Sequence, residues 1–270
     1  MTARVAVLKF PGSNCEAESV RALVRAGLGA EVVRWNERPE SLLEYDAYLL
    51  PGGFSYQDRV RAGAIAARLP VLEVLATRAR EGAPVWGICN GAQILVESGL
   101  VPGDPGGSEA IGIALAPNRI ADRDPYYTRW VYLVPGPGAE RCLFTRGLTE
   151  PLPMPMAHGE GRFVTADAAM ARSLPERLAL AYARPDGRPE TAFPWTPNGS
   201  ALAAAGVANA AGNVLALMPH PERAQVLAQV PEWLEGAWGD RRRRGHTAEA
   251  LEVEGPGMVL FHALARALQR

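Results

Sequence analysis

Short apolar runs alternate with longer amphipathic stretches through the first hundred residues. Gly, Pro or Asn bounds the apolar runs, which predict buried strands. The amphipathic stretches place apolar residues at helical spacing opposite Arg and Glu, which predicts helices packed on a core. We therefore expect strands over Val5–Phe10, Glu31–Trp35, Ala47–Leu50 and Val85–Ile88, and helices over Ala17–Ala26 and Val60–Arg80.

The alternation of strands and helices predicts the fold class. Successive βαβ units build an α/β fold with a central, mostly parallel sheet and helices on both of its faces. In such sheets, ligands bind where loops leave the carboxyl ends of the strands. Functional side chains are therefore expected just after the predicted strands.

The remainder of the chain is less regular. Ala203–Asn209 and Val214–Met218 are expected to form a hairpin, because a turn-forming segment with Gly and Asn separates them. Residues 225–256 are rich in Trp and Arg and are predicted to be an insertion in a single domain that spans residues 1–270. The other predicted elements are strands over Trp130–Val134 and Leu178–Ala183 and a helix over Gly257–Leu268.

Composition narrows the function classes. A net charge of −1 over 270 residues provides no overall field that would attract nucleic acid or an anionic membrane. No run of about 18 apolar residues predicts a membrane-spanning helix, and the apolar run near the amino terminus is too short for a signal peptide. The three cysteines are far apart and form no CxxC pair. This spacing argues against disulfides and a structural zinc site, so we expect no bound metal and a cytoplasmic location.

The segment from Val85 to Leu95 has the strongest chemical signature. An apolar strand is followed by Gly87-Ile88-Cys89-Asn90-Gly91 and then by a helical pattern. This arrangement parallels the nucleophile elbow of G-x-S-x-G hydrolases, in which small flanking residues permit a sharp strand-to-helix turn. Cys89 would then lie at a helix amino terminus, where the helix dipole favours a thiolate. The N–H of Asn90 would face a developing oxyanion.

Two other cysteines compete for the role of nucleophile. Cys15 also follows a strand and precedes a helix, but Ser13-Asn14-Cys15-Glu16 fits a capping box with Ser13 as the N-cap, which favours a structural role. Cys142 lies in an irregular stretch without activating neighbours. A buried, inert thiol is the ordinary alternative for any cysteine, and only the glycine-flanked context of Cys89 outweighs it.

A cysteine nucleophile needs a base, and His220 is the main candidate. It follows a predicted strand in Met218-Pro219-His220-Pro221-Glu222, where the two prolines hold it in extended backbone. Glu222 can turn back to one ring nitrogen and set the tautomer, which is the role of the third member of a catalytic triad. The alternative base is His158, whose glycine-rich segment 157–161 could equally approach a ligand or form a simple turn.

A second source of oxyanion donors follows another predicted strand. Gly52 and Gly53 come after Leu49-Leu50-Pro51, and the lack of a Cβ lets their N–H groups turn toward a ligand. A Gly-Gly pair alone most often marks a turn. The pair gains weight because the predicted nucleophile lies at another strand end of the same sheet.

Several short segments between residue 5 and about residue 225 carry a family pattern. They are Phe10-Pro11-Gly12-Ser13-Asn14-Cys15, Pro51-Gly52-Gly53-Phe54-Ser55-Tyr56, Arg61-Ala62-Gly63-Ala64-Ile65-Ala66, Gly87-Ile88-Cys89-Asn90-Gly91 with Gln93, Ala157-His158-Gly159-Glu160-Gly161, Pro197-Asn198-Gly199-Ser200, and Met218-Pro219-His220-Pro221-Glu222-Arg223. Together they resemble the class I glutamine amidotransferases. More narrowly, they resemble the glutaminase subunits of phosphoribosylformylglycinamidine synthase, an enzyme of purine biosynthesis.

The resemblance implies a flavodoxin-like class I glutamine amidotransferase fold and the hydrolysis of glutamine to glutamate and ammonia. Cys89 would form the glutamyl thioester, His220 would shuttle the proton, and Glu222 would orient His220. Ammonia would pass to a large ATP-dependent synthetase subunit, and a small accessory subunit would complete the complex. No cofactor is expected on this chain, because ATP and magnesium would be bound by the synthetase.

The resemblance also implies a substrate site. Gly53 and Asn90 would offer oxyanion N–H groups, while Phe54 and Gln93 would contact the bound glutamine. Gln57 departs from the family pattern, because it stands where a glycine usually follows the tyrosine of GGFSY. A residue with a Cβ adopts positive φ less readily than glycine, so this loop is expected to take a different path. Arg59 and Ala92 also replace the usual residues, and none of the three departures removes a catalytic group.

Other functions compete with this one. The same chemistry could serve another acceptor pathway, or the fold could be a non-catalytic regulatory module, although the complete set of triad residues argues against the latter. Residues 241–244 are four consecutive arginines that could bind nucleic acid. Without interleaved aromatics they favour a solvated or partner-facing loop instead. The chain carries no GxxxxGK[ST] loop, so we expect it to hydrolyse glutamine poorly without its synthetase.

Overall fold

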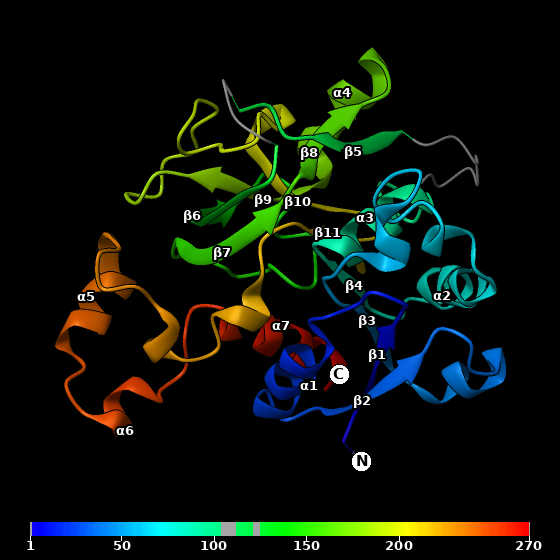
Figure 1. The fold of residues 1–270 in the computed structure, drawn as a ribbon, viewed down its shortest axis with the longest axis horizontal. Coiled ribbons are helices and arrows are strands. Elements are labelled where there is room, and N and C mark those ends of the chain that lie inside the picture. The colour runs from blue at the N-terminus through cyan, green and yellow to red at the C-terminus, as the bar shows by residue number, and fades with distance from the viewer. Residues whose placement is uncertain (1, 104–111, 121–124, 270) are drawn as a thin grey trace.

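A nine-stranded sheet runs through the computed structural model, which describes residues 2–103, 112–120 and 125–269 (Figure 1). In spatial order the strands are β2 (Gly29–Arg34), β1 (Arg4–Lys9), β3 (Ala47–Leu50), β4 (Val85–Ile88), β11 (Val214–Leu217), β10 (Ala204–Ala208), β9 (Leu178–Ala183), β6 (Tyr127–Pro135) and β7 (Leu152–His158). The pairings from β2 to β11 are parallel, and those from β11 to β7 are antiparallel. β5 (Ile113–Pro117) and β8 (Glu160–Thr165) form a separate antiparallel pair.

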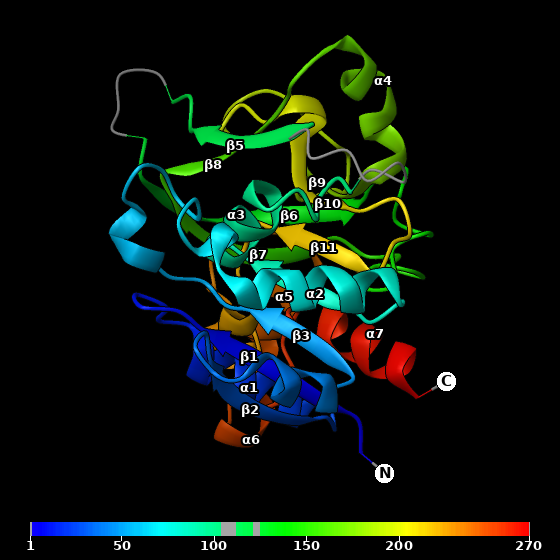
Figure 2. The ribbon, with the colours of Figure 1, turned by 90° about the vertical axis from the view of Figure 1, so that its right-hand side faces the viewer.

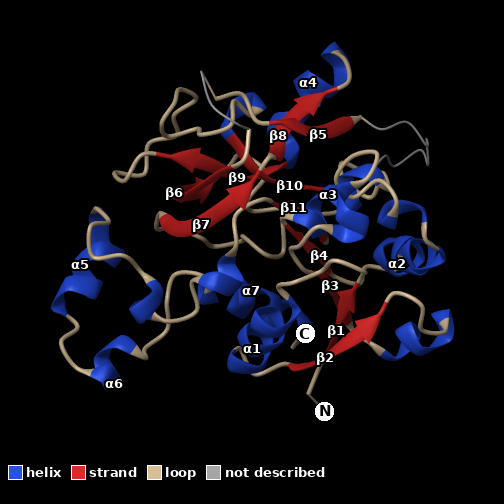
Figure 3. Cartoon of the chain, in the orientation of Figure 1, coloured by secondary structure: helices blue, strands red, loops and turns tan. Residues whose placement is uncertain are grey.

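Helices cover both faces of the parallel half, as expected from the sequence (Figure 2). α1 (Glu16–Arg25) and α7 (Met258–Leu268) contact each other on one face, and α2 (Pro70–Arg80) and α3 (Asn90–Glu97) lie on the other. The α/β class is therefore confirmed, and the central sheet is mixed, with four parallel and four antiparallel pairings where a mostly parallel sheet was expected. None of the helices in the described part of the chain has the length and apolar character needed to cross a bilayer. Figure 3 also shows α4 (Ala168–Arg177), α5 (Gly236–Arg244) and α6 (Ala248–Leu251). The short helices of the described residues are η1 (Pro39–Glu44), η2 (Ser55–Asp58), η3 (Ala66–Arg68), η4 (Ala201–Ala203), η5 (Pro221–Arg223) and η6 (Leu227–Gln229).

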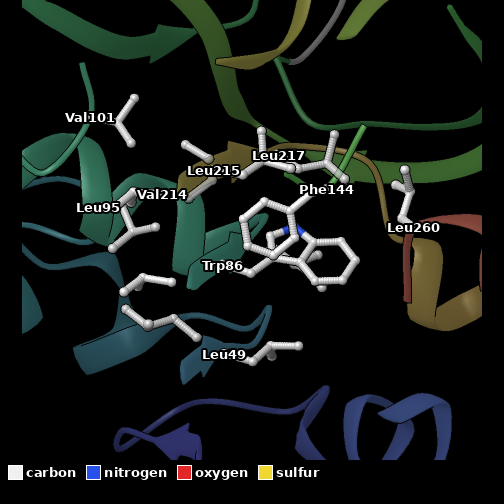
Figure 4. Close-up of a cluster of buried hydrophobic side chains, with 14 of the residues drawn as sticks. Leu49, Trp86, Leu95, Val101, Phe144, Val214, Leu215, Leu217 and Leu260 are labelled. Atoms are coloured by element: carbon white, nitrogen blue, oxygen red, sulfur yellow. The ribbon is translucent and has the colours of Figure 1, made fainter. Parts of the chain in front are cut away.

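Trp86 is fully buried in the main cluster of hydrophobic side chains (Figure 4). Its ring centroid is 4.8 Å from that of Phe261 in α7 and 5.3 Å from that of Phe144. The next residue, Gly87, faces the opposite side of the sheet, where an added Cβ would lie 2.7 Å from Leu95 of α3. β4 is therefore buried on both faces, and close packing holds its carboxyl end in place.

The predicted helix over Val60–Arg80 is wrong in its first part. α2 begins only at Pro70, and the short helix η3 is the only regular element in the residues that directly precede it, 60–69. A proline ring fits the first turn of a helix but clashes in a helix interior, so Pro70 marks the start of α2. The apolar spacing before Pro70 reflects an irregular, partly buried loop instead, in which Ala62, Ala66 and Ala67 are buried and Val60 is exposed.

The predicted capping box at Ser13 is also wrong. The N-cap of α1 is Cys15, and Ser13 Oγ accepts a hydrogen bond from the N–H of Phe10 at 3.0 Å. Glu16 forms an ion pair with Lys9 instead of bonding back to the backbone. The reason is the tight turn at Gly12, where φ of 95° places Ser13 before the helix instead of at its first turn.

Residues 225–256 form a lobe beside the sheet (Figure 1). Apolar side chains of the lobe pack on Tyr132 of β6 in a cluster distinct from the main core: they are Leu227, Val230 and Leu234. The arginines at 241–244 form the last turn of α5, so the predicted loop is wrong. Arginine has high helix propensity, and cations stabilise a helix carboxyl terminus. Three of them form ion pairs, with Glu150, Glu232 and Asp240.

Candidate active site

A cavity of about 300 Å³ lies at the carboxyl ends of the parallel strands, where the fold class predicts ligand binding. Segments that follow β1, β3, β4 and β11 contribute to its wall, and the turn between β7 and β8 closes another side. The sequence-predicted residues that line it are Gly53, Phe54, Cys89, Gln93, His158 and His220. The cavity therefore gathers groups from distant parts of the chain.

Cys89 forms a strained junction between β4 and α3. Its backbone has φ of 51° and ψ of −106°, which is unfavourable for a residue with a Cβ. Close packing holds the turn in this shape: an added Cβ at Gly91 would lie 1.9 Å from Leu50 O, and one at Gly87 would lie 2.4 Å from Gly91 O. The geometry is that of a nucleophile elbow. Asn90 is the first residue of α3, so its N–H has no acceptor within the helix.

His220 and Glu222 form a buried pair beside the two cysteines of the cavity. His220 Nδ1 lies 2.5 Å from Glu222 Oε1, and the two side chains are 4% and 0% exposed. Burial disfavours the charged ring, but the Glu222 carboxylate and the side chains of Cys89 and Cys15 outweigh it and raise the pKa of His220 well above its ordinary value. The structure thus brings Cys89, which precedes α3, together with His220 and Glu222, which both lie in the segment after β11.

Cys15 lies at the same cavity, although the sequence favoured a purely structural role for it. It interacts with His220, and Arg223 Nη2 donates a hydrogen bond to its Sγ at 3.1 Å. Its thiol also lies 3.1 Å from Asn14 Oδ1. Cys142, by contrast, is fully buried away from the cavity, and burial raises the pKa of its thiol, in keeping with the inert role expected for it.

Asn90 and Gln93 connect three parts of the cavity wall. Asn90 Oδ1 accepts a hydrogen bond from the N–H of Ser55 at 3.0 Å, and Asn90 Nδ2 donates one to Gln93 Oε1 at 2.9 Å. Gln93 Nε2 donates a hydrogen bond to the carbonyl oxygen of Glu160 at 2.6 Å. These bonds fix the first turn of α3 against the loops that follow β3 and β7.

The loop after β3 contains several residues in the left-handed region. Gly53 has φ of 152°, and an added Cβ there would lie 2.6 Å from Gly12 O, so a side chain has no room. Gln57 adopts φ of 61° despite its Cβ, and Arg59 donates hydrogen bonds to its Oε1 at 3.0 and 3.2 Å. Gln57 therefore takes up the left-handed backbone that was expected to be difficult for it.

The His158 ring is held neutral, with Nδ1 as a hydrogen-bond acceptor. Asn118 Nδ2, which can only donate, lies 3.1 Å from His158 Nδ1, so the proton of the ring is assigned to Nε2. Burial and the nearby His220 lower the pKa of His158 to about 3. With a pKa of about 3, the His158 ring stays neutral at physiological pH and accepts a proton poorly. His220 is therefore the better candidate for the base.

Two carboxylates of the cavity received no role from the sequence. Asp58 and Glu160 both line it, and burial together with the charge of Glu160 raises the pKa of Asp58 to about 6. Asn90 Nδ2 lies 3.4 Å from Asp58 Oδ1, and the N–H of Ala62 donates to Glu160 Oε2 at 3.3 Å. The signal was present, because Glu160 lies inside the segment around His158 and Asp58 follows the Gly-Gly loop.

Comparison with known proteins identifies relatives over the whole chain. A family model described as the CobB/CobQ-like glutamine amidotransferase domain matches residues 2–265. The phosphoribosylformylglycinamidine synthase subunit PurQ of Methanothrix thermoacetophila is 40% identical over 277 residues, which cover 98% of this chain and 98% of that protein. The PurQ subunit of Pyrococcus furiosus is 42% identical over 223 residues, which cover 82% of this chain and 89% of that protein.

Solved structures of glutamine amidotransferases also superpose on nearly the whole chain. A chain in the structure of PurLQS from Thermotoga maritima superposes with a TM-score of 0.69 at 32% identity, covering 99% of this chain and 100% of that one. A glutamine amidotransferase from Thermotoga maritima superposes with a TM-score of 0.53 at 15% identity, covering 99% of this chain and 98% of that one. The second likeness supports the fold alone.

Proposed function

This chain belongs to the CobB/CobQ-like glutamine amidotransferase family and, within it, to the PurQ subunits of phosphoribosylformylglycinamidine synthase, and we propose that Cys89, His220 and Glu222 are its catalytic triad. As a PurQ subunit it hydrolyses glutamine to glutamate and ammonia for de novo purine biosynthesis. The observation that supports the site best is the strained junction at Cys89 beside the buried His220–Glu222 pair.

In the proposed mechanism, the Cys89 thiolate attacks the side-chain carboxamide carbon of glutamine. The backbone N–H groups of Gly53 and Asn90 stabilise the oxyanion of the tetrahedral intermediate. His220 holds the proton taken from the thiol and delivers it to the leaving nitrogen, so that ammonia departs and a glutamyl thioester remains. Water activated by His220 then releases glutamate. Glu222 keeps the ring oriented and stabilises its charge during both steps.

We further propose that Asp58 and Glu160 receive the α-ammonium group of glutamine. Both line the cavity, and the like charge of Glu160 helps to raise the pKa of Asp58, so a cation between them would relieve their repulsion. Asp58 contacts Asn90, the residue after the nucleophile. An ammonium group held there would orient the substrate with respect to Cys89. Phe54 and Gln93 complete this wall of the site.

The synthetase subunit is proposed to cover the mouth of the cavity. Phe54 and Tyr126 line the cavity and are 46% and 48% exposed, while Phe193 is 55% and Val60 is 92% exposed. Large apolar side chains in such positions mark a surface that another protein buries. A related chain occurs in the structure of PurLQS from Thermotoga maritima, which supports an association with the synthetase PurL.

Several features of the complex follow from the same proposal. ATP and magnesium are bound by the synthetase, a small accessory subunit completes the assembly, and the complex works in the cytoplasm. Residues 1–270 form one amidotransferase domain in which 225–256 is an insertion. The alignment with the PurQ subunit of Pyrococcus furiosus, which covers 82% of this chain, is compatible with extra segments here.

The proposed site is tested by labelling with an electrophilic glutamine analogue, followed by mass spectrometry of the modified cysteine. We expect a single adduct on Cys89 that excess glutamine suppresses. Cys142 is the internal control, because it is buried away from the cavity and should stay unmodified. An adduct on Cys15 that glutamine suppresses would overturn the assignment of the nucleophile.

A further inference from the structure

Three side chains that carry the preferred ligand atoms of zinc lie close together at the proposed active site. Within the part of the chain that the structure describes, Cys15 Sγ, a ring nitrogen of His220 and a carboxylate oxygen of Glu222 lie within 4.8 Å of one another. All three residues are buried. Sulfur, imidazole nitrogen and carboxylate oxygen are the three ligand types that tetrahedral zinc sites use.

A second observation points to a cation at this place. Glu222 is 0% exposed, and its Oε2 has no hydrogen-bond partner among the described residues, while Oε1 is bonded to His220. A buried carboxylate oxygen without a partner costs free energy that a bound cation would recover. We propose that Cys15, His220 and Glu222 form an inhibitory site for Zn²⁺, with the fourth ligand position facing the cavity.

The geometry requires only small movements. Bonds of about 2.0 to 2.3 Å to zinc place neighbouring ligand atoms about 3 to 4 Å apart, so these side chains would have to close by about 1 Å. Zinc displaces the proton of the Cys15 thiol and any proton on the ligating ring nitrogen, and both protons are released to solvent. The thiolate and carboxylate then neutralise the double charge of the ion.

Arg223 is the main opposing charge. Its Nη2 donates a hydrogen bond to Cys15 Sγ at 3.1 Å, and the charge of the guanidinium opposes a second cation there. The Arg223 side chain is 41% exposed and lies 3.9 Å from Glu18, so it can move toward that carboxylate when zinc enters. The site is therefore suited to reversible binding of zinc from solution.

The zinc site would act on the proposed reaction by removing its base. His220 and Glu222 would be held by the metal, so Cys89 would lose its proton acceptor. This consequence rests on the proposed function, whereas metal binding itself does not. A spectroscopic measurement therefore separates the two proposals, because it requires no turnover.

The test is titration of the purified full-length chain with Co²⁺, a spectroscopic substitute for Zn²⁺, followed by displacement with Zn²⁺. We expect a sulfur-to-cobalt charge-transfer band and intense visible bands of tetrahedral cobalt. Cys15→Ser and Glu222→Gln should each weaken binding at least about tenfold, corresponding to about 1.4 kcal/mol. Cys142→Ser, the matched control, should bind as the parent chain does. Cys15→Asp, which restores an anionic ligand, should recover affinity without the charge-transfer band.

Two results would overturn the zinc site. One is a charge-transfer band that survives in Cys15→Ser but disappears in Cys89→Ser, since the metal would then be held by the nucleophile alone. The other is unchanged affinity in Glu222→Gln, with circular dichroism showing that the variant is folded. If the variants bind cobalt as expected but glutaminase activity proves independent of Cys89, the metal site stands and the proposed mechanism falls.

Discussion

Two strand-to-helix junctions each place a cysteine at the cavity, but their backbones differ. Cys89 links β4 to α3 with φ of 51°, between two glycines that have no room for a Cβ. Cys15 precedes α1 with φ of −108°, a conformation open to any residue. The strain is therefore confined to one of the two junctions.

This difference in backbone conformation distinguishes the two thiols, whereas their proximity to the proposed base, His220, does not. Both cysteines interact with His220, so proximity alone would make either of them a candidate nucleophile. A strained elbow exposes its side chain above the sheet, where a substrate can reach it. The thiol of Cys15 is instead bonded to Arg223 and lies against Glu222. Backbone conformation is thus the better guide to which thiol reacts.

Removing each of the two thiols in turn is the strongest test of this distinction. Cys89→Ala removes the proposed nucleophile and should lower kcat for glutamine hydrolysis by at least about 10⁴-fold, because the members of a triad act as a unit. Cys15→Ala removes no group of the proposed reaction and should lower kcat by less than about tenfold. Both are measured as glutamate release in the complex with the synthetase. Equal losses in the two variants would contradict the distinction.

Glu222 bonds the His220 ring, which interacts with both thiols, and its replacement tests what the carboxylate contributes to the reaction. Glu222→Gln should lower kcat by roughly 10³-fold, because the ring loses its orienting partner and the charge that stabilises imidazolium. The Glu222 carboxylate raises the pKa of His220, so the variant should titrate at lower pH. NMR titration of the His220 ring in a Cys89→Ala background measures this. A pKa of His220 that does not change would show that the pair is not coupled as the structure indicates.

Much of the Cys89 junction could be predicted from the sequence because its signals are local. A strand buried on both faces is a continuous apolar run, and the structure has β3, β4 and β9 at their predicted bounds. The glycines around Cys89 are two residues away on either side. Its elbow is therefore encoded within a few residues of the chain.

The contacts of Cys15 could not be predicted because they join distant segments. Arg223, which bonds its sulfur, is 208 residues away in sequence, and the local pattern at Ser13 suggested a capping box that does not form. Asp58 and Glu160 each lie in or beside a segment that the sequence singles out, but only the folded chain shows that the two carboxylates line one cavity. The wrong start of the predicted helix over Val60–Arg80 has a different cause. Pro70 is a local signal for the first turn of a helix, but the apolar spacing on both sides of it suggested one continuous helix.

The glycines of the elbow allow the strain itself to be tested. Gly91→Ala should destabilise the fold by about 3 kcal/mol or more, because its Cβ would lie 1.9 Å from the Leu50 carbonyl oxygen, which is backbone and cannot move aside. Gly29→Ala is the matched control, since its Cβ would approach nothing closer than 3.4 Å. Urea unfolding of the two variants measures the difference. Equal stabilities would mean that the elbow is loosely packed.

The smallest effect on the kinetics is expected from Asp58→Asn, which changes a group proposed to orient glutamine toward Cys89. If Asp58 binds the α-ammonium of glutamine, Asp58→Asn should raise KM about tenfold with a smaller change in kcat, since a charge-assisted hydrogen bond is worth about 1.5 to 3 kcal/mol. The variant should also discriminate less between glutamine and its analogue without the α-amino group. The steady-state kinetics of both substrates measure these effects.

The pH dependence of KM gives this prediction its sharpest form. Burial and Glu160 raise the pKa of Asp58 to about 6, so the carboxylate is charged above that pH and takes up a proton below it. Glutamine binding should therefore weaken as pH falls through about 6, and Asp58→Asn should abolish this rise in KM. Glu150→Gln is the control, because that carboxylate is exposed and pairs with Arg241 away from the cavity. A rise in KM that persists unchanged in Asp58→Asn would assign the titration to another group, and Asp58 would then have no role in orienting glutamine toward Cys89.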